Sequence, residues 1–176
     1  MELGFEIDKI IESIENAETG ETFDSFVLPV TKADLEEVTK KNGWLFDWKL
    51  EASKPEKQVY KLVLQQKPQT ILGIVSLERR VKHIFMNLLE NAPCNIGKEK
   101  KYLGVCGKLV AFVCKLSKDL GFNGVIAFDP KTALIPQYEE MLGAVLISER
   151  RMAIFEKDAQ VLLDKCFPEP ETEANL

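Results

Sequence analysis

The sequence is poor in histidine and lacks both the cysteine spacing of zinc sites and the long apolar runs of membrane spans. Its single histidine is His83, and none of its four cysteines forms a C-x-x-C pair. Zinc sites need several such side chains at short spacing, so no metal site is expected. No apolar run reaches membrane-spanning length, and residues 1–6 are acidic rather than typical of a secretory signal. We therefore expect a cytoplasmic protein with reduced thiols and no membrane partner.

An excess of positive charge is absent as well. The sequence has 23 lysines and arginines but 28 acidic residues, and its formal net charge of −5 excludes a general nucleic-acid footprint. One local exception is a group of lysines around a glycine-containing loop: Lys98, Lys100, Lys101 and Lys108. Such a group either is simply solvated or steers an anionic ligand.

The glycine-containing loop, residues 101–107, leads directly into the pattern of a long amphipathic helix. Apolar residues recur at helical spacing at Leu109, Phe112, Val113, Leu116 and Leu120, and Gly121 is a natural stop. A glycine turn at a helix start leaves backbone N–H groups unpaired beside the positive end of the helix dipole, which favours phosphate binding. The alternative is that the glycines only allow a tight strand-to-helix turn.

Two common phosphate loops do not match these residues. A Walker loop requires a glycine where the chain has Tyr102, and a serine or threonine where it has Leu109. A dinucleotide fingerprint requires glycines where the chain has Cys106 and Leu109. Both nucleotide-binding classes are therefore excluded.

The loop resembles the acyl-CoA pyrophosphate loop of the GNAT N-acetyltransferase superfamily, written Gln/Arg-x-x-Gly-x-Gly/Ala. Lys101 takes its first place, Gly104 its fourth and Cys106 its sixth. A buried strand is expected on each side, at residues 81–90 and 124–129, as in the GNAT core. This resemblance implies that the strand before the loop separates from the strand after the helix, which makes room for the pantetheine arm.

A second motif of the superfamily lies further along the chain. The run Tyr138-Glu-Glu-Met-Leu-Gly143-Ala is similar to the closing motif Tyr-Glu-Lys-Leu-Gly-Phe, with the same order and spacing. The resemblance covers about residues 58–156, whereas residues 1–57 match no clear motif. We expect residues 1–167 to form a single GNAT-like acyltransferase domain and residues 168–176 to be a disordered acidic tail.

The expected fold is α/β (α+β), with a GNAT-like mixed, mostly antiparallel central sheet and helices on both of its faces. Thr31 is the expected N-cap of a helix, and Lys67-Pro68 the turn between two antiparallel strands. Exposed strand edges near residues 144–155 would allow a homodimer. The remaining predicted elements are helices at 7–17, 32–41 and 158–167, strands at 23–30, 59–65, 70–78, 144–148 and 151–155, and an extended segment at 44–48.

By resemblance, the chain is an acyl-CoA-dependent N-acyltransferase that moves an acetyl group from acetyl-CoA to a primary amine of a small molecule or protein. The alternative is a non-catalytic protein on the same scaffold that binds a ligand or another protein. Gly104, Gly107 and the run 138–143 favour the enzyme. Cys106 in place of glycine, and Lys131 where relatives carry an asparagine, favour the alternative.

The resemblance also implies which residues hold acetyl-CoA. The backbone N–H groups of residues 104–108 would bind its pyrophosphate, and the pantetheine arm would lie along the strand near Glu90. Lys131 departs from the asparagine of relatives and would meet either a phosphate or no ligand group. The full set of expected cofactor-binding residues is Leu89, Asn91, Lys101, Gly104, Val105, Cys106, Gly107, Lys108 and Lys131.

Two residues are the candidates for catalysis. In the superfamily the tyrosine matching Tyr138 donates a proton to the departing thiolate, whereas the alternative is a packed ring whose hydroxyl bonds to backbone. Glu90 is the candidate base for the amine, unless it is only a solvated strand end. The aromatic side chains Trp44, Phe46 and Trp48 either belong to the core or line the acceptor site.

Overall fold

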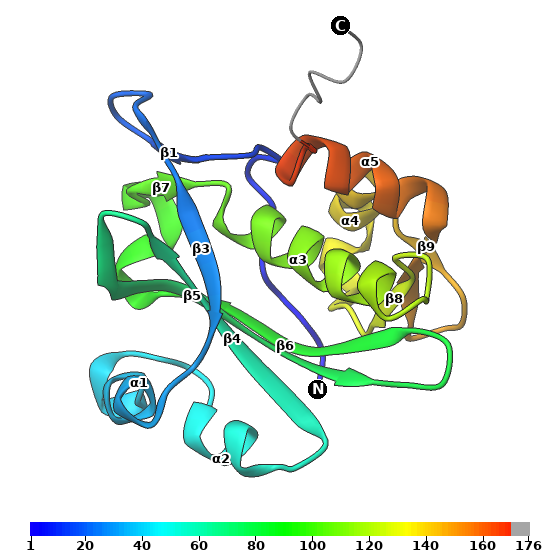
Figure 1. Ribbon diagram of the computed structural model, residues 1–176, viewed down its shortest axis with the longest axis horizontal. Helices are drawn as coiled ribbons and strands as arrows, with labels where there is room; N and C mark the ends of the chain where they lie inside the picture. Colours follow the sequence, from blue (N-terminus) through cyan, green and yellow to red (C-terminus); the bar gives the residue numbers. More distant parts are fainter. Residues whose placement is uncertain (170–176) are drawn as a thin grey trace, which may run out of the picture.

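The computed structural model describes residues 1–169, and most of the predicted acidic tail lies outside this range. Figure 1 shows a twisted sheet with α3 and α5 on one side and α1 and α2 on the other. Residues 71–77, at the middle of the longest strand, are all buried, as expected where helices cover both faces of a sheet. No helix among residues 1–169 is long and apolar enough to cross a membrane.

Residues 1–169 contain five α-helices: α1 (Lys32–Glu37), α2 (Trp48–Ser53), α3 (Val105–Asp119), α4 (Ile135–Leu142) and α5 (Glu156–Cys166). The strands are β1 (Ile14–Asn16), β2 (Thr22–Phe23), β3 (Ser25–Pro29), β4 (Lys57–Leu64), β5 (Lys67–Arg79), β6 (Ile84–Asn91), β7 (Tyr102–Leu103), β8 (Ile126–Phe128), β9 (Val145–Leu146) and β10 (Met152–Ile154). Four short 3-10 helices lie at Lys40–Asn42, Pro93–Asn95, Gly97–Glu99 and Thr132–Leu134.

The main sheet has the order β3-β4-β5-β6-β8-β10-β9, and every neighbouring pair is antiparallel except β6 with β8. The predicted mixed, mostly antiparallel sheet is therefore confirmed. A small second sheet has the order β2-β1-β7. The terminal strand β9 leaves Val145 and Leu146 about half exposed, and a homodimer through this edge stays a prediction.

The parallel pair β6 and β8 separates soon after it starts. Only two residue pairs are in register, Ile84 with Ile126 and Phe85 with Ala127, although β6 continues to Asn91. The separation that the resemblance implied is thus present. Leu3 lies beside the end of β8: its N–H donates to the Asp129 carbonyl at 2.7 Å, and its carbonyl accepts from the Lys131 N–H at 2.8 Å.

We call residues 1–13 the covering segment, drawn in dark blue in Figure 1, where it runs past α3 towards β1. The helix predicted at 7–17 was wrong: residues 4–13 belong to no helix or strand, and β1 follows at Ile14. Isoleucines at 7, 10, 11 and 14 satisfy helical spacing, but β-branched side chains also suit extended chain. Here Ile7 and Ile14 are buried against distant parts of the chain, and this tertiary packing decides the conformation.

Two local predictions need correction and one is confirmed. The segment 44–48 is not a strand; α2 starts at Trp48, capped by Asp47, whose carboxylate accepts from the Leu50 N–H at 3.0 Å. The hairpin turn lies at residues 65–66, and Lys67 already pairs with Leu64. Thr31 caps α1 as expected, in a capping box with Asp34.

The other predicted elements are present with shifted ends. The strand expected at 81–90 begins only at Ile84, because residues 80–83 turn and the Arg80 N–H bonds the His83 carbonyl at 2.9 Å. The strand at 124–129 is β8, those at 144–148 and 151–155 are β9 and β10, and the helix at 158–167 is α5.

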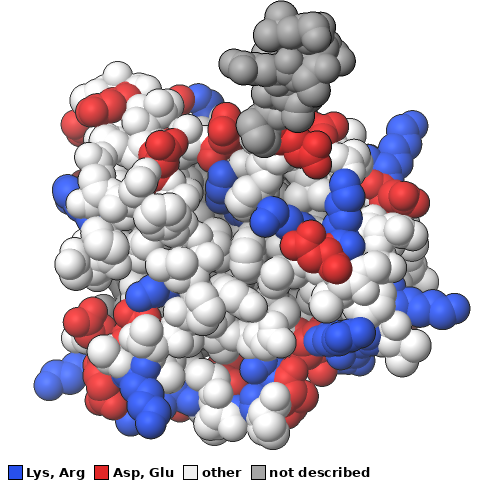
Figure 2. All heavy atoms as spheres, viewed as in Figure 1, with Lys and Arg blue, Asp and Glu red and all other residues white. Residues whose placement is uncertain are grey.

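On the face shown in Figure 2, basic and acidic side chains are interspersed around a mainly uncharged centre.

Candidate functional site

The start of α3 has the glycine turn that the sequence predicts. Gly104 adopts φ 94°, a left-handed conformation that only glycine adopts without strain, and α3 begins at the next residue. Among residues 1–169 no acceptor is found for the N–H groups of Val105, Cys106 and Gly107. These three donors lie at the positive end of a 15-residue helix, which favours an anion there.

An anion from the chain itself already lies at this turn. The Asp8 carboxylate accepts from the Gly104 N–H at 2.9 Å through Oδ1, and Lys100 Nζ lies 2.9 Å from its Oδ2. Both contacts join residues more than 90 positions apart in the sequence. In this structure a carboxylate takes the Gly104 N–H, and its binding of a phosphate stays a prediction.

Both glycines at the start of α3 also permit close approach of the covering segment. A Cβ added at Gly107 would lie 2.7 Å from the Lys9 carbonyl oxygen, and one added at Gly104 would lie 2.9 Å from Ile11 Cγ1. Such distances are below any normal van der Waals contact. The covering segment therefore packs directly onto the turn, and a larger residue at Gly107 would push its backbone away.

The side chain of Lys108 also takes part in the contact between α3 and the covering segment. Its Nζ donates to the carbonyls of Glu12 and Cys166, each at 2.6 Å, and lies 4.1 Å from the ring centroid of Phe167. Burial lowers the pKa of Lys108 below its ordinary value. Its own N–H bonds to the Gly104 carbonyl at 3.0 Å. The expectation that Lys108 faces a phosphate thus needs correction, since both its side chain and its amide have protein partners.

Tyr138, on α4, lies under the covering segment rather than in an open cleft. Its side chain is fully buried, its hydroxyl donates to the Phe5 carbonyl, and its ring stacks on that of Phe5 with centroids 4.9 Å apart. Burial raises the pKa of Tyr138 well above the ordinary value of a tyrosine. The arrangement has the packed ring and backbone-bonded hydroxyl of the alternative, and the role as acid stays a prediction.

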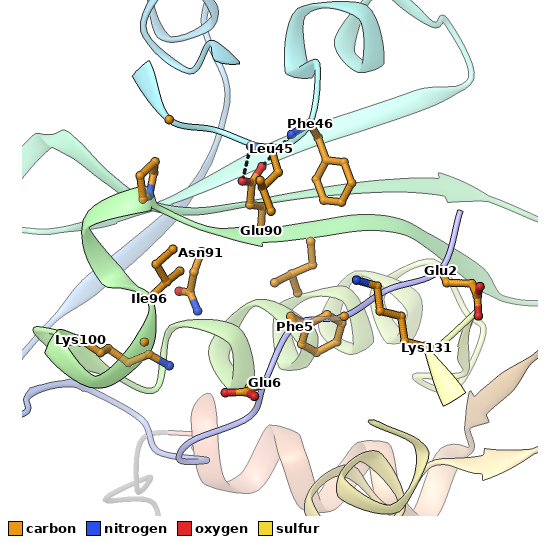
Figure 3. Close-up of a pocket in the computed structure, with 15 residues that line it drawn as sticks. Glu2, Phe5, Glu6, Leu45, Phe46, Glu90, Asn91, Ile96, Lys100 and Lys131 are labelled. Atoms are coloured by element: carbon orange, nitrogen blue, oxygen red, sulfur yellow. Dashed lines mark hydrogen bonds between the residues drawn. The ribbon is translucent and has the colours of Figure 1, made fainter. Parts of the chain in front are cut away.

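Glu90 is held by the segment that follows Gly43. Its carboxylate accepts from the Leu45 N–H at 2.7 Å and the Phe46 N–H at 3.3 Å (Figure 3). It also accepts from Trp48 Nε1 at 2.8 Å. The side chain is buried, so it is not the solvated strand end of the alternative. Its role as a base stays a prediction, and its evident role is to hold residues 45–48 against β6.

A cavity of about 280 Å³ lies between the covering segment, the end of β6 and residues 43–46. Figure 3 shows the side chains around it. The expected cofactor-binding residues Leu89, Asn91 and Lys131 line it together with Glu90. Other lining residues are Glu2, Phe5, Glu6, Phe46 and Lys100. Carboxylates, ammonium groups and two aromatic rings thus meet at one cavity, which suits a ligand with both charged and apolar parts.

The structure divides the expected site residues into two groups. One lines the cavity, and the other, Gly104 to Lys108, forms the start of α3 with the covering segment packed on it. Lys101 belongs to neither: its side chain is exposed, and its carbonyl accepts from the Ala17 N–H at 2.8 Å. Of the aromatic residues, Trp44 and Trp48 are buried in the core, and Phe46 lines the cavity.

Two residues at the site, Phe5 and Asp8, were missed by the sequence reasoning because the covering segment matches no motif. The signal that was present is the alternation of apolar and polar residues from Leu3 to Ile7, which is typical of extended chain. Asn95 was also missed. It is fully buried and holds the loop before α3, accepting from the Tyr102 N–H at 2.8 Å and donating to the Tyr102 carbonyl at 3.1 Å.

No protein-family model matches this sequence, and no curated protein matches it either. Solved structures of spermidine N-acetyltransferase SpeG from Vibrio cholerae are similar in fold. A chimera of that enzyme with hSSAT gives a TM-score of 0.55 at 16% identity, covering 77% of this chain and 98% of that one. The enzyme solved in complex with CoA and spermine gives 0.52 at 17%, with coverages of 77% and 98%. At these identities the likeness concerns the fold, and the chain has the GNAT fold.

Proposed function

We propose that the protein is an acyl-CoA-dependent N-acyltransferase that moves an acetyl group from acetyl-CoA to a primary amine of a small molecule or protein. One observation carries the proposal: in the interior of the main sheet, β6 separates from β8 beside a glycine turn that leaves three N–H groups without acceptors among residues 1–169. A GNAT-fold neighbour was solved with CoA and the amine spermine, which supports the same pairing of ligands.

Binding would use backbone groups first. The N–H groups of Val105, Cys106 and Gly107 would donate to phosphate oxygens, and the ammonium groups of Lys100 and Lys131 would balance their charge. Leu89 to Asn91 on β6 would face the pantetheine arm along the cavity. Cys106 is compatible with this arrangement, because its amide is retained and its side chain packs into the core.

In the transfer itself, the amine nitrogen bonds to the acetyl carbon and the carbon–sulfur bond breaks. The amine loses a proton and the departing thiolate gains one. Tyr138 is the proposed donor to the thiolate, because a tyrosine hydroxyl carries its proton at neutral pH. Glu90 is the proposed acceptor of the amine proton, since it lines the cavity and its Oε2 accepts a single protein hydrogen bond, from Leu45.

A second candidate is a non-catalytic protein on this scaffold that binds a ligand or another protein. The observation that favours it is that the chain itself occupies the proposed catalytic groups. The Tyr138 hydroxyl is bonded to Phe5, and the Gly104 amide is bonded to Asp8. The two candidates differ in turnover, not in fold.

The test is calorimetric titration with CoA, followed by acetylation assays on a panel of primary amines that includes spermidine and spermine. CoA at 100 times its Kd is expected to raise the unfolding free energy by about 2.7 kcal/mol. Tyr138→Phe is expected to keep CoA binding and to lower kcat about 100-fold, the loss typical of a general acid. Binding of CoA without turnover on any amine would support the second candidate, and no binding at millimolar CoA would contradict the enzyme.

A further inference from the structure

We infer that the covering segment is a displaceable internal occupant of the acyl-CoA site, so that the ligand binds only when residues 1–13 leave the start of α3. The identity of the displacing ligand rests on the proposed function. The position of the segment does not, because it follows from contacts within the chain.

The first argument is the backbone position of the segment. Beyond Phe85, β6 has no strand partner on the side of β8, and the chain at Leu3 lies along the continuation of β8. Its two hydrogen bonds, to Asp129 and Lys131, are those of a short parallel bridge. The segment thus enters the space that the separating strands leave, where a pantetheine arm would have to lie.

The second argument is chemical. The Asp8 carboxylate has an amide donor at the α3 start and an ammonium partner, Lys100, on its other oxygen. A phosphate at a helix start uses the same two kinds of group. Asp8 and a CoA phosphate would therefore compete for the Gly104 N–H and for Lys100.

The third argument concerns the groups that the segment hides. Tyr138 is bonded to the Phe5 carbonyl, and Cys106, in the first turn of α3 on which the segment packs, is almost fully buried. Both residues belong to the proposed site. One movement of the segment would therefore free a catalytic hydroxyl and a phosphate-binding turn together.

The local structure of the covering segment also favours its release. Residues 4–13 have no helix or strand of their own, and residues 8–13 are each at least partly exposed. Segments with few buried apolar contacts open locally at a lower free energy than the core around them. Leu3, Phe5 and Ile7 anchor the first half of the segment in the core, whereas residues 8–13 are held by single contacts, chiefly those of Asp8 and Glu12, with no continuous strand ladder.

The test compares two variants with the same change of charge. Asp8→Asn removes the carboxylate charge at the turn, and Glu18→Gln removes an exposed carboxylate just outside the segment. We expect Asp8→Asn to bind CoA at least tenfold more tightly than the unmodified chain by calorimetry, and Glu18→Gln to stay within twofold. Asp8→Ala, which also removes the hydrogen-bond acceptor, is expected to bind at least as tightly as Asp8→Asn.

A second readout needs no CoA. A thiol reagent with peptide-level mass spectrometry reports Cys106 under the segment and Cys114 in the middle of α3, both buried. We expect Asp8→Asn to label Cys106 about tenfold faster than Glu18→Gln does, with Cys114 unchanged, which separates movement of the segment from global unfolding. Labelling of Cys106 at the same rate in both variants would overturn the inference.

The outcomes also separate this inference from the proposed function. Fast labelling of Cys106 in Asp8→Asn without binding of CoA to any variant would contradict the acyltransferase and leave a displaceable segment. Equal CoA affinity in Asp8→Asn and Glu18→Gln, with CoA clearly bound, would support CoA as the ligand. It would overturn the proposed competition between Asp8 and a CoA phosphate.

Discussion

The covering segment packs on the turn at the start of α3, but the helix and the segment are attached to the rest of the protein in different ways. Eleven residues of α3 are buried, and the helix packs on β5, β6 and α5 while its own hydrogen bonds keep its shape. The covering segment buries Leu3, Phe5 and Ile7 but has no helix or strand ladder of its own, and its polar contacts, such as those of Asp8 and Glu12, reach across more than 90 residues. The proposed binding turn therefore lies on a rigid helix, whereas the covering segment over it is expected to open at a lower free energy.

The largest expected difference comes from truncating one buried side chain in each region. Leu109→Ala in α3 should lower the unfolding free energy by about 2–5 kcal/mol, the range for a buried leucine in a close-packed core. Ile7→Ala in the covering segment should cost about 1 kcal/mol, because local opening of the segment limits its contribution. Urea unfolding measures both, and equal losses would show that the segment is part of the rigid core.

The glycines of the turn sharpen the same comparison. Gly107→Ala would place a Cβ against the Lys9 carbonyl, so we expect a loss of about 1–3 kcal/mol and faster labelling of Cys106. Gly121→Ala, past the end of α3, has φ +86° but meets nothing within 4 Å, and should cost about 1 kcal/mol from backbone strain alone. If Gly107→Ala left the labelling of Cys106 unchanged, the segment would not be packed on this turn.

The buried hydrogen bonds of Glu90 provide a further comparison, with contacts inside the core. Glu90→Gln keeps the size of the side chain but weakens the acceptor of three donors, and should lower stability by about 1–2 kcal/mol. The matched variant Trp48→Phe removes one of those donors and should cost about 1 kcal/mol. Unchanged urea midpoints for both would argue that residues 45–48 are not held by Glu90.

The smallest effect is a dependence on pH. Burial raises the pKa of Cys106 to about 12, so above pH 9 the unfolded chain loses a thiol proton that the folded chain keeps. The stability from this thiol is complete below pH 9 and falls by about 1.4 kcal/mol per pH unit above it, up to the folded pKa. Cys106→Ala should therefore lose less stability between pH 8 and pH 10 than the unmodified chain. Exposed Cys94 gives the control, because Cys94→Ala should follow the unmodified chain.

The parts that the sequence predicts well are those whose pattern is local. The apolar spacing from Leu109 to Leu120 gives α3, and Thr31 gives the cap of α1, because the residues involved lie within a few turns of each other. The covering segment has no such local determinant. Its isoleucines fit a helix as well as an extended chain, and its partners, Gly104, Lys108 and Tyr138, are 96 to 133 residues away.

In the candidate site, too, the local motifs were predictable and the long-range contacts were not. The glycine turn and the separation of β6 from β8 were expected from motifs within residues 58–156, and both are present. The packing of Asp8 on that turn could not be expected, because no motif links residue 8 to residue 104. Tyr138 belongs to the closing motif and lies on α4, but the partner of its hydroxyl is Phe5, in the part of the chain without a motif.

Hydrogen exchange with and without CoA tests the central claim most directly. The amides of Leu3 and Lys131 are protected by the bridge between the covering segment and the end of β8, and the Gly104 amide by Asp8. We predict that CoA speeds exchange at Leu3 and Lys131 and keeps Gly104 protected, because a phosphate replaces the carboxylate while the bridge opens. CoA bound at saturation with the exchange of Leu3 and Lys131 unchanged would contradict the account.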